Sequence, residues 1–172
     1  SSDLCRSYYS FLEGASSPDA LAYQAAALGL PAIALTDRNG LYGALGFYRA
    51  CCEVNVKPII GCEFYVAHHS RHEKNRESGK RSNYHLVLLA KDDTGYHNLC
   101  RLSSIGYVEG FYYVPRIDND ILAKYKDGLV CLSACLSGRV PQEILNGDED
   151  SLAEQVQWFK DLFGEEDRKS VV

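Results

Sequence analysis

Four side chains of types that bind metals in proteins are spread along the chain, namely Glu13, Glu63, His85 and Cys135. Carboxylate, imidazole and thiolate groups bind zinc and other transition metals, and a site that a fold assembles draws them from distant segments. The long intervals between these residues form no local motif. Residue types alone therefore leave two interpretations open: a catalytic metal site, or polar side chains that are satisfied within the core.

Glu63 is the most constrained of the four, because it lies in the run Pro58–Ala67, which is rich in β-branched and aromatic residues. Such a run predicts a strand of a parallel sheet that is covered on both faces. Burying a carboxylate without a partner costs several kcal/mol. We therefore expect Glu63 to meet a metal, a cation or water.

Strands and helices are predicted to alternate along the chain, which is typical of an α/β fold with a parallel sheet or barrel. The expected strands are 3–10, 32–37, 58–67, 85–91 and 128–134. The expected helices are 18–29, 43–54, 92–105, 140–145 and 148–162, with a loop and a short helix between 110 and 118. Chemistry in such folds gathers at the carboxyl ends of the strands. Glu63 and Cys135 fit that rule, whereas His85 stands at the start of its strand.

The composition is that of a globular domain. The chain has 172 residues, of which 46% are hydrophobic and 24% charged, and its net charge of −5 argues against wrapping nucleic acid by bulk electrostatics. No apolar run approaches the ~18 residues of a membrane span, so we expect no membrane partner. Seven cysteines without CxxC spacing predict reduced thiols in the cytoplasm, most of them small core residues.

A polar segment of mixed charge, 71–81, is predicted to be a loop. It is interpreted as a solvated surface excursion or, because five of its side chains are Lys or Arg, as a phosphate contact. His68, His69 and His72, in or beside it, are expected to be exposed. Both ends of the chain look trimmed, so we expect an incomplete fragment with one domain over 1–164 and a tail of uncertain origin over 165–172.

Several stretches carry a family resemblance: Ser7–Ala15, Gly29–Asp37, Lys57–Glu63, Tyr84–Leu86, Gly95–Cys100, Gly110–Asp118 and Leu132–Gly138. On these motifs the chain resembles the amino-terminal polymerase-and-histidinol-phosphatase (PHP) domain of the bacterial DNA polymerase III alpha subunit, a C-family replicative polymerase. The resemblance implies a distorted (β/α)7-type barrel with a metal cluster at the strand ends.

The resemblance also implies site residues. The positions that hold metal in the family correspond to Glu13, Glu63, His85 and Cys135. Where intact members have a His-x-His pair, however, this chain has Leu4 and Arg6, and where they read Thr-Asp-His it has Arg38. A guanidinium stays protonated and cannot bind a metal. We therefore expect no cofactor at full occupancy; zinc, manganese or magnesium are the candidates if any binds.

These departures motivate a hypothesis in which Arg6 and Arg38 replace the metals through charge-assisted pairs with the carboxylates. In the alternative, both arginines extend to solvent and water hydrates Glu63. Two functions follow: a non-catalytic module that supports the rest of the alpha subunit and docks a proofreading exonuclease, or a metal-dependent phosphoesterase or 3′–5′ exonuclease. Polymerisation and DNA contact would belong to a longer parent polymerase.

Overall fold

The computed structural model describes residues 4–74, 83–147, 149–164 and 168–169. Its strands are β1 (Leu4–Cys5), β2 (Ala32–Leu35), β3 (Lys57–Ala67), β4 (Asn83–Ala90), β5 (Arg116–Ile117), β6 (Leu129–Leu132) and β7 (Arg168–Lys169). Its helices are α1 (Pro18–Ala27), α2 (Ala44–Glu53), α3 (Asp93–Val108), α4 (Asn119–Lys124), α5 (Arg139–Asn146) and α6 (Glu149–Phe163).

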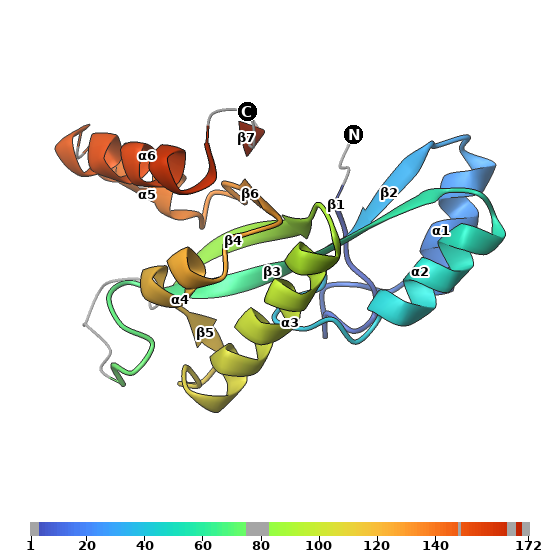
Figure 1. Cartoon of the computed structure of the whole chain (residues 1–172), viewed down its shortest axis with the longest axis horizontal. Helices are drawn as coiled ribbons and strands as arrows, with labels where there is room; N and C mark the ends of the chain where they lie inside the picture. The colour runs from blue at the N-terminus through green and yellow to red at the C-terminus, as the bar shows by residue number, and fades with distance from the viewer. Residues whose placement is uncertain (1–3, 75–82, 148, 165–167, 170–172) are drawn as a thin grey trace.

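The described residues form one mixed sheet, with the strand order β1-β2-β3-β4-β6-β7 and with β5 paired to β3 (Figure 1). The strands β1, β2 and β3 run parallel, but β4 is antiparallel to both of its neighbours, β3 and β6. The predicted parallel arrangement is therefore wrong at β4, which runs antiparallel to its neighbours. No helix follows β3 in the part of the loop before β4 that the structure describes, and without a crossover helix the chain returns antiparallel.

The reversed direction of β4 explains the position of His85. Tyr65, near the end of β3, pairs with His85, near the start of β4. Leu132, the last residue of β6, pairs with Val87. The amino end of β4 therefore lies at the same edge of the sheet as the carboxyl ends of β3 and β6. His85 reaches the expected edge because its strand runs the other way.

Local sequence signals set the helix ends. The Ser17 hydroxyl accepts a hydrogen bond from the Ala20 amide at 3.1 Å, with Pro18 in the first turn of α1, as predicted. The predicted stop at Gly29 is confirmed by its left-handed backbone, with φ of 67°. The short helix expected within 110–118 is wrong: that stretch holds β5, and the helix α4 follows it. The Asp118 carboxylate caps α4 because it accepts from the Ile121 amide at 3.2 Å.

Two apolar clusters form the core of the described residues. One packs α1 and α2 against β2, and the other packs α3, α4 and α6 against β3, β4 and β6 (Figure 1). Cys51, Cys62 and Cys131 are buried in these clusters, while the remaining four cysteines are partly or fully exposed, so most are not core residues. None of the seven cysteines, all of which lie in the described ranges, forms a disulfide bond.

The three histidines in or beside the predicted loop differ in exposure. His69 and His72 are exposed, as predicted, but His68 is half-buried with its ring 4.2 Å from the ring of Tyr84. Residues 75–81 of the predicted loop lie outside the described residues, as do 165–167 and 170–172 of the proposed tail. The boundary at 164 thus stays a prediction. Among the described residues no helix is long and apolar enough to cross a membrane.

Candidate functional site

The candidate site lies where the first three strands end. Arg6 follows β1 directly, Arg38 follows β2, and Glu63 lies in the second half of β3. Backbone hydrogen bonds hold Arg38 beside Glu63 through the two residues that flank Arg38. The Glu63 amide donates to the Asp37 carbonyl at 3.0 Å, and the Asn39 amide donates to the Glu63 carbonyl at 2.7 Å. Three segments that are distant in sequence therefore bring their charges to one edge of the sheet.

Two guanidiniums and two carboxylates form a closed set of ion pairs. Arg6 Nη1 donates to Glu13 Oε2 at 2.6 Å, and Arg6 Nη2 contacts Glu63 Oε2. Arg38 Nη2 donates to Glu63 Oε1 at 3.1 Å, and Arg38 Nη1 contacts Glu13 Oε1. Each arginine thus bridges the same two glutamates. We name Arg6, Glu13, Arg38 and Glu63 the charge cluster.

His85 and Cys135 extend the charge cluster toward β6. His85 Nδ1 lies 2.8 Å from Glu63 Oε1, and Cys135 Sγ lies 3.7 Å from the same nitrogen. The Ser137 amide also donates to Cys135 Sγ, at 3.4 Å. Since an ionised carboxylate can only accept, the proton of the His85 ring is assigned to Nδ1. The four candidate ligand positions are therefore brought together with both arginines.

His85 and the two arginines of the charge cluster keep Glu63 ionised although the residue is only 3% exposed. Burial by itself raises the pKa of Glu63, but the hydrogen bond from His85 and the charges of Arg6 and Arg38 outweigh burial and lower that pKa to about 2. Burial likewise disfavours the charged form of Arg38, yet the negative charge of Glu63 and the other acidic neighbours raise the pKa of Arg38 above its usual value. Both groups therefore stay charged across the neutral range.

Tyr65 supports the charge cluster, and the sequence reasoning missed it. Its hydroxyl accepts from Arg38 Nη1 at 3.0 Å, and the Arg38 guanidinium lies 5.2 Å from the centre of its ring. The sequence does indicate that Tyr65 lies near Glu63. Tyr65 is two residues after Glu63 in the same strand, so both side chains lie on the same face of the sheet.

Asp37 fixes the segment that carries Arg6 and Glu13, and its partners were also missed. Asp37 is 1% exposed, and it accepts from the Ser7 amide at 2.7 Å, from the Ser7 hydroxyl at 2.6 Å and from the Ser10 hydroxyl at 2.7 Å. The Arg38 amide in turn donates to the Ser10 hydroxyl at 3.1 Å. The loop after β1 is thereby tied to the end of β2.

Arginines contact every carboxylate oxygen of the charge cluster. All four carboxylate oxygens of Glu13 and Glu63 already contact a guanidinium nitrogen, and one of them also contacts His85. A cation that bound these oxygens would have to displace fixed positive charges. Within the described ranges, no three His, Cys, Asp or Glu side chains form a group that could hold a metal ion.

Comparison with known proteins assigns the family. A family described as "PHP domain" matches residues 5–169. The chain belongs to the PHP domain family. The match confirms the PHP resemblance drawn from the sequence motifs. It also covers every member of the charge cluster together with His85 and Cys135. The fold is correspondingly α/β, as expected.

The PHP domain is similar to bacterial polymerase subunits. It is 51% identical over 94% of its length to "DNA polymerase III subunit alpha" of Chlamydia trachomatis, and 46% identical over 92% of its length to the same subunit of Treponema pallidum. It spans only 13% and 14% of those relatives. Those relatives are therefore about seven times as long as this chain.

Among solved structures, an amidohydrolase from Chromobacterium violaceum matches with a TM-score of 0.41 and 22% identity. That match covers 60% of this chain and 34% of the other. A likeness at this level supports no conclusion about chemistry.

Proposed function

We propose that this PHP domain is a structural and partner-docking module of a bacterial replicative DNA polymerase III alpha subunit, with a degenerate metal site. The observation that carries the proposal is the contact of Arg6 and Arg38 with both Glu13 and Glu63. The polymerase setting is supported by relatives that are named DNA polymerase III subunit alpha and match more than nine-tenths of the chain.

Charge balance supports this reading of the site. Two guanidiniums offset two carboxylates, so the cluster needs no further cation to be neutral. A metal-dependent phosphoesterase needs open metal positions that activate water and bind phosphate oxygens. Here the oxygens that would bind a metal accept hydrogen bonds from arginines, and the cluster links β1, β2 and β3 instead.

The competing function is a metal-dependent phosphoesterase or 3′–5′ exonuclease that uses zinc, manganese or magnesium. The test is release of nucleotides from the labelled 3′ end of single-stranded DNA by the purified chain, with each metal added in turn. We expect release no faster than with the Glu63→Ala variant. Release that requires added metal and is lost in Glu63→Ala would refute the structural role.

The docking role concerns the longer polymerase. The proposed partners are the rest of the alpha subunit, a separate proofreading exonuclease subunit, and DNA through the parent polymerase, all in the cytoplasm. The test is a pull-down of the cognate exonuclease with full-length polymerase and with polymerase that lacks this domain. We expect capture only when the domain is present. Equal capture by both forms, with unchanged polymerase stability, would contradict the docking role.

A further inference from the structure

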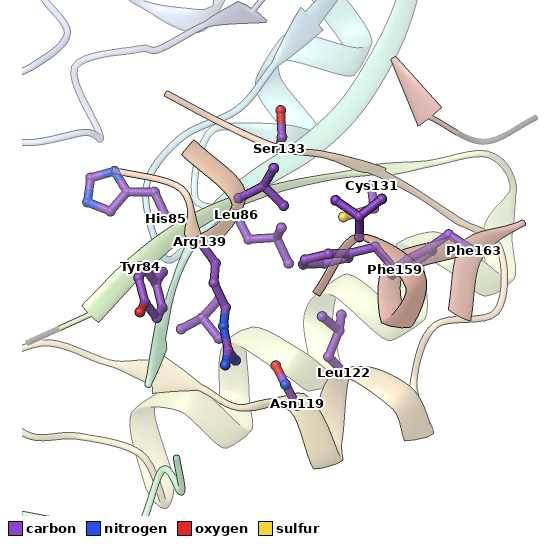
Figure 2. Close-up of a pocket in the computed structure, with 13 residues that line it drawn as sticks. Tyr84, His85, Leu86, Asn119, Leu122, Cys131, Ser133, Arg139, Phe159 and Phe163 are labelled. Atoms are coloured by element: carbon purple, nitrogen blue, oxygen red, sulfur yellow. The ribbon is translucent and has the colours of Figure 1, made fainter. Parts of the chain in front are cut away.

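A cavity of about 370 Å³ lies away from the ion pairs of the charge cluster, between the strands β4 and β6 and the helices α4, α5 and α6 (Figure 2). Most of its wall is apolar. Figure 2 shows Leu122, Cys131, Phe159 and Phe163 on one side and Tyr84 with Arg139 on the other. Its volume is within the range of small-molecule sites, which are mostly apolar with a few placed polar groups.

Arg139 is the charged group in the wall of this cavity, and its bonding is incomplete. Its Nε is buried and has no hydrogen-bond partner among the described residues. The nearest carboxylate, Glu143 Oε1, is 4.0 Å from Nε, which is beyond hydrogen-bonding distance. The guanidinium lies 5.5 Å from the centre of the Tyr84 ring. The Arg139 side chain as a whole is 21% exposed, but its buried Nε–H lacks an acceptor, which an anionic group in the cavity would supply.

The local backbone adds to this positive potential. Arg139 and Val140, both in the cavity wall, are the first two residues of α5. The N-cap of α5 is Gly138, which provides no side-chain hydrogen bond. The positive end of the helix dipole is therefore at the same wall as the guanidinium. Asn119 and Ser133 supply an amide and a hydroxyl, and no Asp or Glu lines the cavity in the part of the chain that the structure describes.

We propose that this cavity binds a small amphipathic anion, with its apolar body against Phe159 and Phe163 and a carboxylate, sulfonate or phosphate group at Arg139. The ligand class follows from one guanidinium and a few further polar groups, those of Tyr84, His85, Asn119 and Ser133, in a mostly apolar wall. His85 also lines the cavity, but its Nδ1 is bound to Glu63. None of the four charge-cluster residues lines the cavity, so a change at Arg139 tests the anion site without altering those ion pairs.

The test compares two probes that share one apolar body, 4-phenylbutyrate and its neutral amide, 4-phenylbutanamide. The single tryptophan, Trp158, lies with its ring 5.0 Å from Phe159, so its fluorescence reports on the cavity. We expect the anion to bind about tenfold more tightly than the amide, the effect of one charge-assisted hydrogen bond. Titration calorimetry on the same samples confirms the stoichiometry of one probe per chain.

Four variants locate the probe. Arg139→Gln is expected to remove the preference for the anion and to leave the affinity for the amide, whereas Arg139→Lys keeps the preference. The matched control Arg49→Gln, an exposed arginine on α2, is expected to change neither probe. Val156→Phe fills the cavity and is expected to weaken both. Equal affinity of the wild type for the two probes, or no binding of either, would overturn the proposal, and so would a preference that Arg139→Gln leaves intact.

Discussion

Replacement of Glu63 by glutamine removes the negative charge at the centre of the charge cluster while it keeps the shape of the side chain. Glu63 is 3% exposed and contacts Arg6, Arg38 and His85. In the Glu63→Gln variant two guanidiniums share one remaining carboxylate, that of Glu13. Removal of one partner from a buried ion pair leaves an uncompensated charge, so we expect a large loss of stability.

The size of the loss follows from the pKa of Glu63. That pKa is lowered from 4.5 to about 2 in the folded chain. At about 1.4 kcal/mol for each pKa unit, the ionised carboxylate contributes about 3 kcal/mol to the free energy of unfolding at neutral pH. We expect Glu63→Gln to lower the free energy of unfolding by about this amount.

The pH dependence gives a second, independent signature. Because the folded pKa is below the unfolded one, the contribution of Glu63 is full above pH 4.5 and is lost as the pH falls toward about 2. The stability difference between wild type and Glu63→Gln should therefore shrink to less than half at pH 3. Urea unfolding at pH 7 and at pH 3, followed by the fluorescence of Trp158 and by circular dichroism, measures both values.

The control for this experiment is Glu154→Gln, which removes an exposed carboxylate from α6 and should leave stability within about 0.5 kcal/mol of wild type. A Glu63→Gln variant as mild as this control at pH 7 would refute the stabilising role of the buried carboxylate. A stability difference of the same size at both pH values would also contradict it, since the carboxylate charge would then not be the cause.

Three further changes test buried contacts at the site and elsewhere in the fold by the same urea unfolding. Asp37→Asn removes the charge that accepts from Ser7 and Ser10, so it should lower the free energy of unfolding by about 2–3 kcal/mol; a loss below 0.5 would contradict the buried network. Arg116→Lys should lower it by about 2 kcal/mol, because an ammonium cannot reproduce a guanidinium that donates to three backbone carbonyls. Gly110→Ala should lower the free energy of unfolding by more than about 2 kcal/mol, because the alanine Cβ would lie 1.9 Å from the Arg116 carbonyl oxygen. A variant as stable as wild type would show that the backbone moves apart at no cost.

Much of the site could be predicted from residue types. A carboxylate in an apolar run requires a partner, and the two arginines supply the charge that Glu63 needs. The chain delivers Arg38 to Glu63 because β2 and β3 are parallel neighbours, and their order is what a strand and helix alternation predicts. The contact between Arg6 and Glu13 could be expected only from the family resemblance, since the segment between them has no regular structure.

Other parts depend on long-range geometry that spacing does not encode. The direction of β4 is one case, because the segment before it gives no signal that distinguishes a crossover from a return. The contacts that hold the loop after β3 are a second case. Arg71 Nη1 lies 3.0 Å from Asp118 Oδ2, and Arg116 donates to the Arg71 carbonyl at 2.9 Å. These residues are more than forty positions apart, and only the fold shows that they meet.

The metal content of the purified chain tests the central claim most directly. Elemental analysis after purification without chelators should find far less than one zinc, manganese or iron ion per chain. The reason is that Arg6 and Arg38 already contact the carboxylate oxygens of Glu13 and Glu63 that would bind a metal. The double variant Arg6→His with Arg38→His should gain bound metal, whereas the matched exposed pair Arg49→His with Arg101→His should not. Stoichiometric, tightly bound metal in the wild-type chain would contradict the account.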